Sequence, residues 1–159
     1  MTQQFDTSWL VGQFVLSRNK SPVPEGWATG RIGSWLLGHH PSLPAIRLLG
    51  VDDRPVGWLL GYPIDEKGKL LDGRDVLRIP GLTECLTSTN IEQFVYNFGG
   101  RYLVAIVGVQ QPRLYLDPCG SLSVVYCVQQ EIVASTPNLI PYDEQTSDRV
   151  DLNLSLIHI

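Results

Sequence analysis

The sequence predicts an α+β fold in which antiparallel strands form a sheet and helices cover its faces. Four strand candidates follow one another in residues 101–134, with short turn-rich connections. Connections this short force antiparallel neighbours, because a parallel crossover needs a dozen residues or more. The candidates at 101–109 and 122–128 are apolar at successive positions, so both faces of the sheet should be covered. An amphipathic helix candidate lies just upstream, and strands with separate helices indicate an α+β arrangement.

Composition limits the function classes. The chain has 159 residues and a formal net charge of −4, with 43% apolar and 18% charged residues. This suits a globular domain rather than a disordered chain, and it gives no general attraction to nucleic acid or an anionic membrane. The longest apolar run, 103–109, is too short to span a bilayer. The first residues lack signal-peptide features, so the cytoplasm is the expected compartment.

The residues before Ala45 are expected to be irregular. Residues 17–33 are rich in proline, glycine and basic residues, which is typical of loops. We expect aromatic side chains of this part to hold it on the core; an aromatic ligand cage is the alternative. The expected organisation is an irregular segment at 1–44, the main domain at 45–150 and an apolar C-terminal run at 151–159.

The first regular elements are expected after residue 44. Apolar runs at 45–49 and 56–62, joined by an Asp-rich turn, predict a hairpin. Pro63 is expected to end the second strand, because proline cannot donate to a β-ladder.

Residues 89–98 have the clearest helix pattern. Thr89 and Glu92 have capping-box spacing, and Gly99-Gly100 supplies a left-handed stop. The apolar stripe at i, i+3, i+4 and i+7 comprises Ile91, Phe94, Val95 and Phe98. The strands at 101–109, 113–117, 122–128 and 131–134 follow, and Pro141 limits a last helix after Ser135 to about one turn.

Motifs of common catalytic sites are absent from the sequence. It contains no GxSxG, P-loop, GxGxxG or HExxH, and its three cysteines form no CxxC pair. Cys119-Gly120-Ser121 matches part of a papain-type nucleophile region but lacks the residues that follow it there. His39-His40 has no third ligand nearby, so packing or surface roles are expected. We therefore predict no metal and no cofactor.

Three short blocks occur in a fixed order. They are Gly100-Arg101-Tyr102, Asp117-Pro118-Cys119-Gly120 and Val133-Ala134-Ser135. This order resembles the G-x-F, D-P-x-G and F-A-S blocks of the glutaminase domain of class II glutamine amidotransferases, above all asparagine synthetases and beta-lactam synthetases. Upstream, 59–65 resembles a degenerate N-G-E-I-Y-N strand end, and 87–92 lies where the family has S-D-T-E. The resemblance covers 45–140; an unrelated antiparallel sheet with a chance Asp-Pro-x-Gly turn is the alternative.

The resemblance implies an N-terminal-nucleophile-like layered fold, with antiparallel sheets flanked by helices. In the family, an N-terminal cysteine attacks the glutamine amide, and an asparagine side chain and a glycine N–H hold the oxyanion. Here position 2 is Thr2, the oxyanion asparagine falls on Leu60, and only Gly61 is kept. We expect no catalytic residue and no glutamine hydrolysis. Thr2 is a nucleophile only in the alternative of an active N-terminal-threonine amidohydrolase.

Two functional hypotheses follow. In the first, the chain is a catalytically inactive glutaminase-like domain with a structural or regulatory role. In the second, it is a free-standing small-molecule binding module on the same fold. The candidate ligand-binding residues are Gly61, Tyr62, Trp58, Arg101, His39 and His40.

Two further segments have structural expectations. Asp117 and Gly120 are expected to form a structural turn, in which the aspartate caps its own backbone. The run at 151–159 is mostly apolar and is expected to be an interaction surface. It is either the last strand or helix of the domain or the start of a junction to a missing second domain, and the second interpretation is favoured. Its expected partner is a synthetase-like domain or a second copy of this chain.

Overall fold

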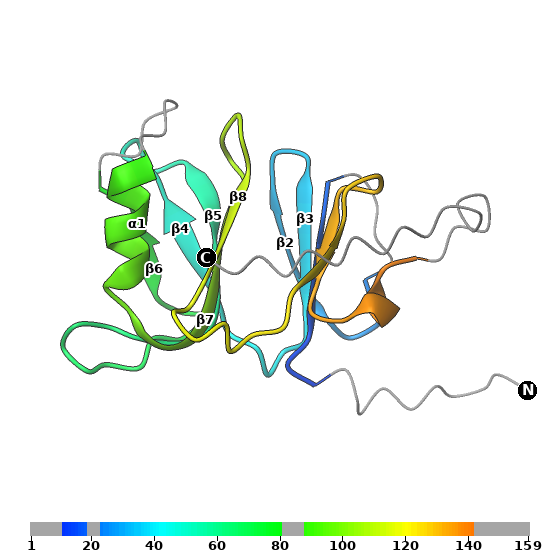
Figure 1. The fold of residues 1–159 in the computed structure, drawn as a ribbon, viewed down its shortest axis with the longest axis horizontal. Coiled ribbons are helices and arrows are strands. Elements are labelled where there is room, and N and C mark those ends of the chain that lie inside the picture. The colour runs from blue at the N-terminus through cyan, green and yellow to red at the C-terminus, as the bar shows by residue number, and fades with distance from the viewer. Residues whose placement is uncertain (1–10, 19–22, 81–87, 142–159) are drawn as a thin grey trace, which may run out of the picture.

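Two packed β-sheets and one α-helix make up the part of the chain that the structure describes. The computed structural model describes residues 11–18, 23–80 and 88–141. Figure 1 shows the two sheets beside each other, with the helix on the outer face of one of them. We call the helix-covered sheet sheet I and the other sheet II.

Sheet I has the strand order β6-β4-β5-β7-β8. Its pairs are antiparallel except for β4 with β6, which is parallel. The strands are β4 (Ala45–Leu49), β5 (Pro55–Ile64), β6 (Val76–Arg78), β7 (Gly99–Ile106) and β8 (Arg113–Leu116). The helix α1 (Ser88–Tyr96) covers one face of this sheet.

Sheet II has the strand order β2-β3-β1-β10-β9 and is antiparallel throughout. It joins two distant parts of the sequence, since Val15 in β1 pairs with Ala134 in β10. The strands are β1 (Phe14–Ser17), β2 (Ala28–Ile32), β3 (Trp35–His39), β9 (Val125–Cys127) and β10 (Ile132–Ala134).

The strand β7 shows how side-chain alternation builds the two cores. Val104 and Ile106 pack with α1, whereas Leu103 and Ala105 pack in the cluster shared with sheet II. Each of these four side chains is at most 1% exposed. Successive side chains of a strand point to opposite faces, so a run without a polar side requires cover on both faces. The expectation of covered faces is confirmed for this strand.

The predicted α+β layered fold, with antiparallel sheets flanked by helices, is wrong. The described residues form ten strands and a single α-helix, so the architecture is mainly β with one mixed and one antiparallel sheet. After Ser135 the chain makes only the 3₁₀ turn η2 (Pro137–Leu139) before Pro141. The outer face of sheet II is covered by η2 and irregular chain, through residues that include Val23, Trp27, Leu139 and Ile140.

The prediction that residues 1–44 are irregular is also wrong, because this part of the chain contains β1, β2 and β3. Of its described glycines, Gly26 lies in a turn before β2 and Gly33 lies in the β2–β3 turn, with the strand β2 between them. Polar residues such as Thr29 and Arg31 are exposed on β2, which is an edge strand of sheet II. An edge strand tolerates such residues, so its sequence lacks the apolar pattern of a buried strand.

Pro63 does not end its strand, since β5 runs on to Ile64. Pro63 pairs with Gly100 in β7, while its carbonyl accepts the Leu71 N–H at 2.9 Å on the other side of β5. The missing proline N–H therefore faces away from β7. A proline is tolerated where the side that it cannot donate to is not part of a ladder.

The four strands after α1 are not one meander. β7 and β8 form one hairpin and β9 and β10 another, but β8 and β9 are edge strands of different sheets. The hairpin β4–β5 and the helix α1 are confirmed, with α1 ending two residues before the predicted boundary. The short connection after β8 moves the chain from sheet I to sheet II, which loop length alone does not reveal.

Candidate functional site

A pocket of about 210 Å³ is lined by residues of both sheets. Sheet II contributes β2 and β3, and sheet I contributes β4, β5 and the chain that enters β6. The lining residues are Thr29, Gly30, Leu37, His39, Ala45, Arg47, Trp58, Gly73, Asp75 and Val76. Polar groups of several kinds thus converge on a partly apolar hollow, which is the usual composition of a small-molecule site.

Trp58 forms a largely buried wall of this pocket. Its side chain is only 5% exposed, and its Nε1–H has no hydrogen-bond acceptor among the residues that the structure describes. Gly30 lies against the indole: a Cβ at residue 30 would stand 3.2 Å from Trp58 Nε1. Because Gly30 also lines the pocket, its missing side chain leaves the indole nitrogen accessible from the pocket.

Arg47 stands beside Trp58. The two residues are directly opposite in the β4–β5 register, so their side chains lie on the same face of sheet I. Arg47 is exposed and makes no ion pair with any described residue. The pocket therefore has one guanidinium whose donors are available to a ligand.

His39 has one ring nitrogen that is available to a ligand in the pocket. Its Nδ1 lies 2.8 Å from the carbonyl oxygen of Leu43, so Nδ1 carries the proton and donates to that oxygen. Nε2 is then the ring nitrogen that remains for another contact.

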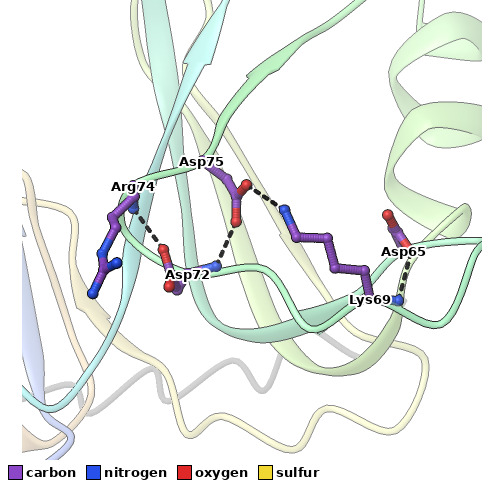
Figure 2. A network of polar contacts seen from close by, with 5 residues as sticks. All are labelled: Asp65, Lys69, Asp72, Arg74 and Asp75. Atoms are coloured by element: carbon purple, nitrogen blue, oxygen red, sulfur yellow. Dashed lines mark hydrogen bonds and ion pairs between the residues drawn. The ribbon is translucent and has the colours of Figure 1, made fainter.

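Asp75 reaches the pocket at the end of an ordered loop (Figure 2). Its carboxylate binds the Lys69 ammonium at 2.7 Å and accepts the Asp72 N–H at 2.8 Å. The hydrogen bond from Lys69 lowers the pKa of Asp75, and the same bond raises the pKa of Lys69. Asp65 accepts the N–H groups of Lys67 and Lys69, which fixes the turn that brings Lys69 there. The charge of Asp75 is thus balanced within the loop.

The predicted ligand-binding residues divide into two groups. Trp58 and His39 line the pocket together, but Gly61, Tyr62, Arg101 and His40 do not. The Gly61 N–H donates to the Pro44 carbonyl at 2.9 Å, and Tyr62 Oη donates to the Ser42 carbonyl at 2.7 Å.

The other two residues of this second group also lie away from the pocket. Arg101 is exposed opposite Tyr62 in the β5–β7 register. The Nδ1 of His40 bonds the Ser42 hydroxyl at 2.7 Å, and its ring meets Trp27 edge-on. The hypothesis of a binding module on a glutaminase-like fold assigned to one site residues that belong to different surroundings.

Asp117 and Gly120 form a turn at the end of β8. The carboxylate of Asp117 is buried and accepts the N–H groups of Cys119 at 2.9 Å and Ser121 at 3.0 Å, together with the Ser121 hydroxyl at 3.0 Å. It also accepts the Tyr102 N–H at 3.3 Å. Gly120 has a φ of 59°, which glycine adopts without strain. These contacts give Asp117 a structural role.

Arg47, Asp75 and Gly30 are pocket residues that the sequence analysis missed. Arg47 had a recognisable signal, since it is the charged residue within the apolar strand Ala45–Leu49. Asp75 and Gly30 had none, because turns and edge strands commonly contain both residue types. Their role depends on how the two sheets face each other.

A second, wider hollow of about 600 Å³ lies near the β2–β3 and β7–β8 turns. Its lining combines polar groups with the apolar residues Ile32, Trp35, Pro55 and Val107. Arg18 at its edge forms an ion pair with Glu131 at 2.6 Å, so its charge is already balanced. The pocket at Trp58 has the more specific set of available polar groups.

Several expectations cannot be placed on this structure. Thr2, Cys85 and the run at 151–159 lie outside the described residues. Within the ranges that are described, no cluster of three or more metal-ligand side chains occurs, and no helix is long and apolar enough to cross a membrane. No family model, no curated protein and no solved structure matches this chain.

Proposed function

We propose that this chain is a non-catalytic domain that binds a small molecule in the pocket between sheets I and II. The observation that supports the proposal most is the indole N–H of Trp58, which faces the pocket and has no hydrogen-bond acceptor among the described residues. An acceptor atom of a ligand can take this hydrogen bond, which contributes about 0.5–1.5 kcal/mol. The available groups of His39 and Arg47 provide further contacts.

The non-catalytic part of the proposal rests on β5. Leu60 is fully buried and carries no donor, and the neighbouring Gly61 N–H is already bonded to Pro44. This segment therefore offers no pair of free donors for an oxyanion, and loss of one such donor alone raises a barrier by about 3–4 kcal/mol. An inactive glutaminase-like domain with a regulatory role agrees with this, but the part of the chain that the structure describes has a single α-helix rather than the flanking helices of that family. We therefore base the proposal on the pocket.

Glutamine hydrolysis tests the catalytic alternative. Ammonia release from L-glutamine, measured on the full chain, should equal the rate without protein. A saturable rate that disappears in Thr2→Ala would contradict the proposal.

Filling the pocket tests the binding function. Gly30→Val places a branched side chain against the Trp58 indole, whereas Ala28→Val adds similar bulk at an exposed position of the same strand. The indole N–H cross-peak of Trp58, assigned through Trp58→Phe in ¹H–¹⁵N NMR spectra, reports on occupancy. A set of small carboxylates, amides, amines and sugars should contain a compound that shifts this peak in wild type and in Ala28→Val.

The pocket-filled variant supplies the decisive comparison. Gly30→Val should retain the dispersed spectrum of a folded protein and lose the ligand-induced shift. Two results would contradict the binding function: no compound shifts the Trp58 peak, or Gly30→Val binds the same compound as tightly as wild type does.

A further inference from the structure

We infer that the pocket selects a small carboxylate with a short apolar stem, whose oxygens are bound by Arg47 and Trp58. This inference rests on the proposed function and names the class of ligand.

The charges favour an anion. Arg47 has no ionic partner among the described residues, whereas Asp75 is neutralised by Lys69 at 2.7 Å. The carboxylate of Asp75 also accepts the Asp72 N–H, so both of its oxygens are engaged within its own loop. The unbalanced charge at the pocket is therefore the guanidinium, whose planar fork of N–H donors matches a carboxylate.

The positions of the donors favour two oxygens on one carbon. Arg47 and Trp58 are cross-strand neighbours on one face of sheet I. Side chains in that relation start about 5 Å apart, close enough to contact one group together. A carboxylate can accept the guanidinium N–H groups and the indole N–H at the same time. An amide has a single acceptor oxygen, so its NH₂ group would face the N–H donors of Arg47 or Trp58 without forming a hydrogen bond.

The rest of the lining favours a short apolar stem. Leu37, Ala45 and Val76 provide apolar surface beside the two donors. The volume of about 210 Å³ is below the range of about 300–1,000 Å³ that is typical of sites for drug-sized ligands. A carboxylate with a chain of a few carbons fits both properties.

A pair of ligands matched in shape tests the inference on the full chain. Butanoate and butanamide differ in charge and in one terminal atom; butylammonium and inorganic phosphate serve as the cationic and the non-carboxylate anionic probes. We expect butanoate to shift the Trp58 indole peak and to bind at least tenfold more tightly than butanamide, with little binding of the other two.

Variants link that preference to the two donors. Arg47→Met should weaken butanoate binding tenfold or more and remove its advantage over butanamide. Trp58→Phe keeps an aromatic ring but removes the N–H, and should weaken butanoate binding severalfold. Because this variant lacks the indole peak, titration calorimetry measures its affinity and that of wild type. Arg101→Met removes an exposed arginine outside the pocket and should leave the affinity unchanged.

The outcomes separate the inference from the proposed function. Equal or tighter binding of butanamide or butylammonium, with a shift of the Trp58 peak, would overturn the carboxylate class and leave the binding function standing. Tighter binding of phosphate would replace the carboxylate with a different anion. Unchanged butanoate binding in Arg47→Met, or no binding of butanoate, would also overturn the inference, whereas the wider compound set decides the binding function.

Discussion

Sheets I and II share one core but are built differently. The strands of sheet I come from the continuous stretch 45–116, and α1 packs on its outer face with a large cluster of buried residues. Sheet II unites residues 14–39 with 125–134, and the buried residues of its outer cluster, within the described ranges, are Val15, Ile132, Ala134 and Leu139. Closing a long loop has an entropic cost that a local sheet avoids. We therefore expect sheet I to be the more stable part of the domain.

The largest expected effect is a charge in the core of sheet I. Ile106→Asp places a carboxylate at a fully buried position under α1 and should prevent folding, because its burial costs about as much as the whole stability of a domain. Leu139→Asp changes the smaller cluster outside sheet II and should leave a folded but weakened protein. Urea unfolding followed by circular dichroism measures both variants. A cooperative transition of Ile106→Asp near that of wild type would contradict the comparison.

Glycine substitutions give the next largest difference between the sheets. A Cβ at Gly57 in β5 would overlap the backbone carbonyl oxygen of Ala105, and strand backbones cannot move apart without loss of pairing. Gly57→Ala should therefore lower the free energy of unfolding by about 3 kcal/mol. A Cβ at Gly38 in β3 meets the Val23 side chain at 2.6 Å, and Val23 lies on irregular chain that can shift. Gly38→Ala should cost about 1 kcal/mol, and similar losses in urea titrations of both variants would refute the contrast.

The third largest effect is expected at the Asp117 turn, where the chain passes from sheet I to sheet II. Asp117→Ala removes the acceptor of the Cys119, Ser121 and Tyr102 N–H groups, and should destabilise the protein by about 2 kcal/mol. Asp72→Ala removes an exposed carboxylate that caps its own loop and should change the stability by less than about 0.5 kcal/mol. Thermal unfolding compares the two. Equal stabilities would mean that the crossing from sheet I to sheet II does not depend on this carboxylate.

The smallest expected effect appears only at high pH. Burial raises the pKa of Tyr102 to about 12, with smaller contributions from Asp117 and Tyr96. An unfolded tyrosine ionises near pH 10. The stabilising contribution is therefore complete below about pH 10 and is lost as the pH rises through about 12.

Ultraviolet titration detects this ionisation. The Tyr102 hydroxyl donates to the Val95 carbonyl at 2.7 Å, so this residue also ties sheet I to α1. The chain has six tyrosines, and Tyr102→Phe should remove the last step of the phenolate absorbance. Loss of an early step instead would show that Tyr102 is open to water.

The sequence by itself determined the elements whose partners are close in the chain. The β4–β5 hairpin and α1 are such elements, because turn residues and apolar periodicity act over a few residues. The strand β7 is another, since its unbroken apolar run demands cover on both faces. The prediction that a helix also covers the face of β7 opposite α1 was wrong, because sheet II covers that face in this protein.

Only the tertiary structure decided sheet II and the pocket. The pairing of Val15 with Ala134 joins strands more than a hundred residues apart, and no local pattern specifies such a partner. The same holds for Gly30 against the Trp58 indole: the first is an ordinary residue of an edge strand and the second an ordinary core aromatic. Their meeting across two sheets places an indole N–H beside Arg47 with no acceptor among the described residues. A site of this kind arises from packing, because its groups are brought together by the faces of strands rather than by their spacing in the chain.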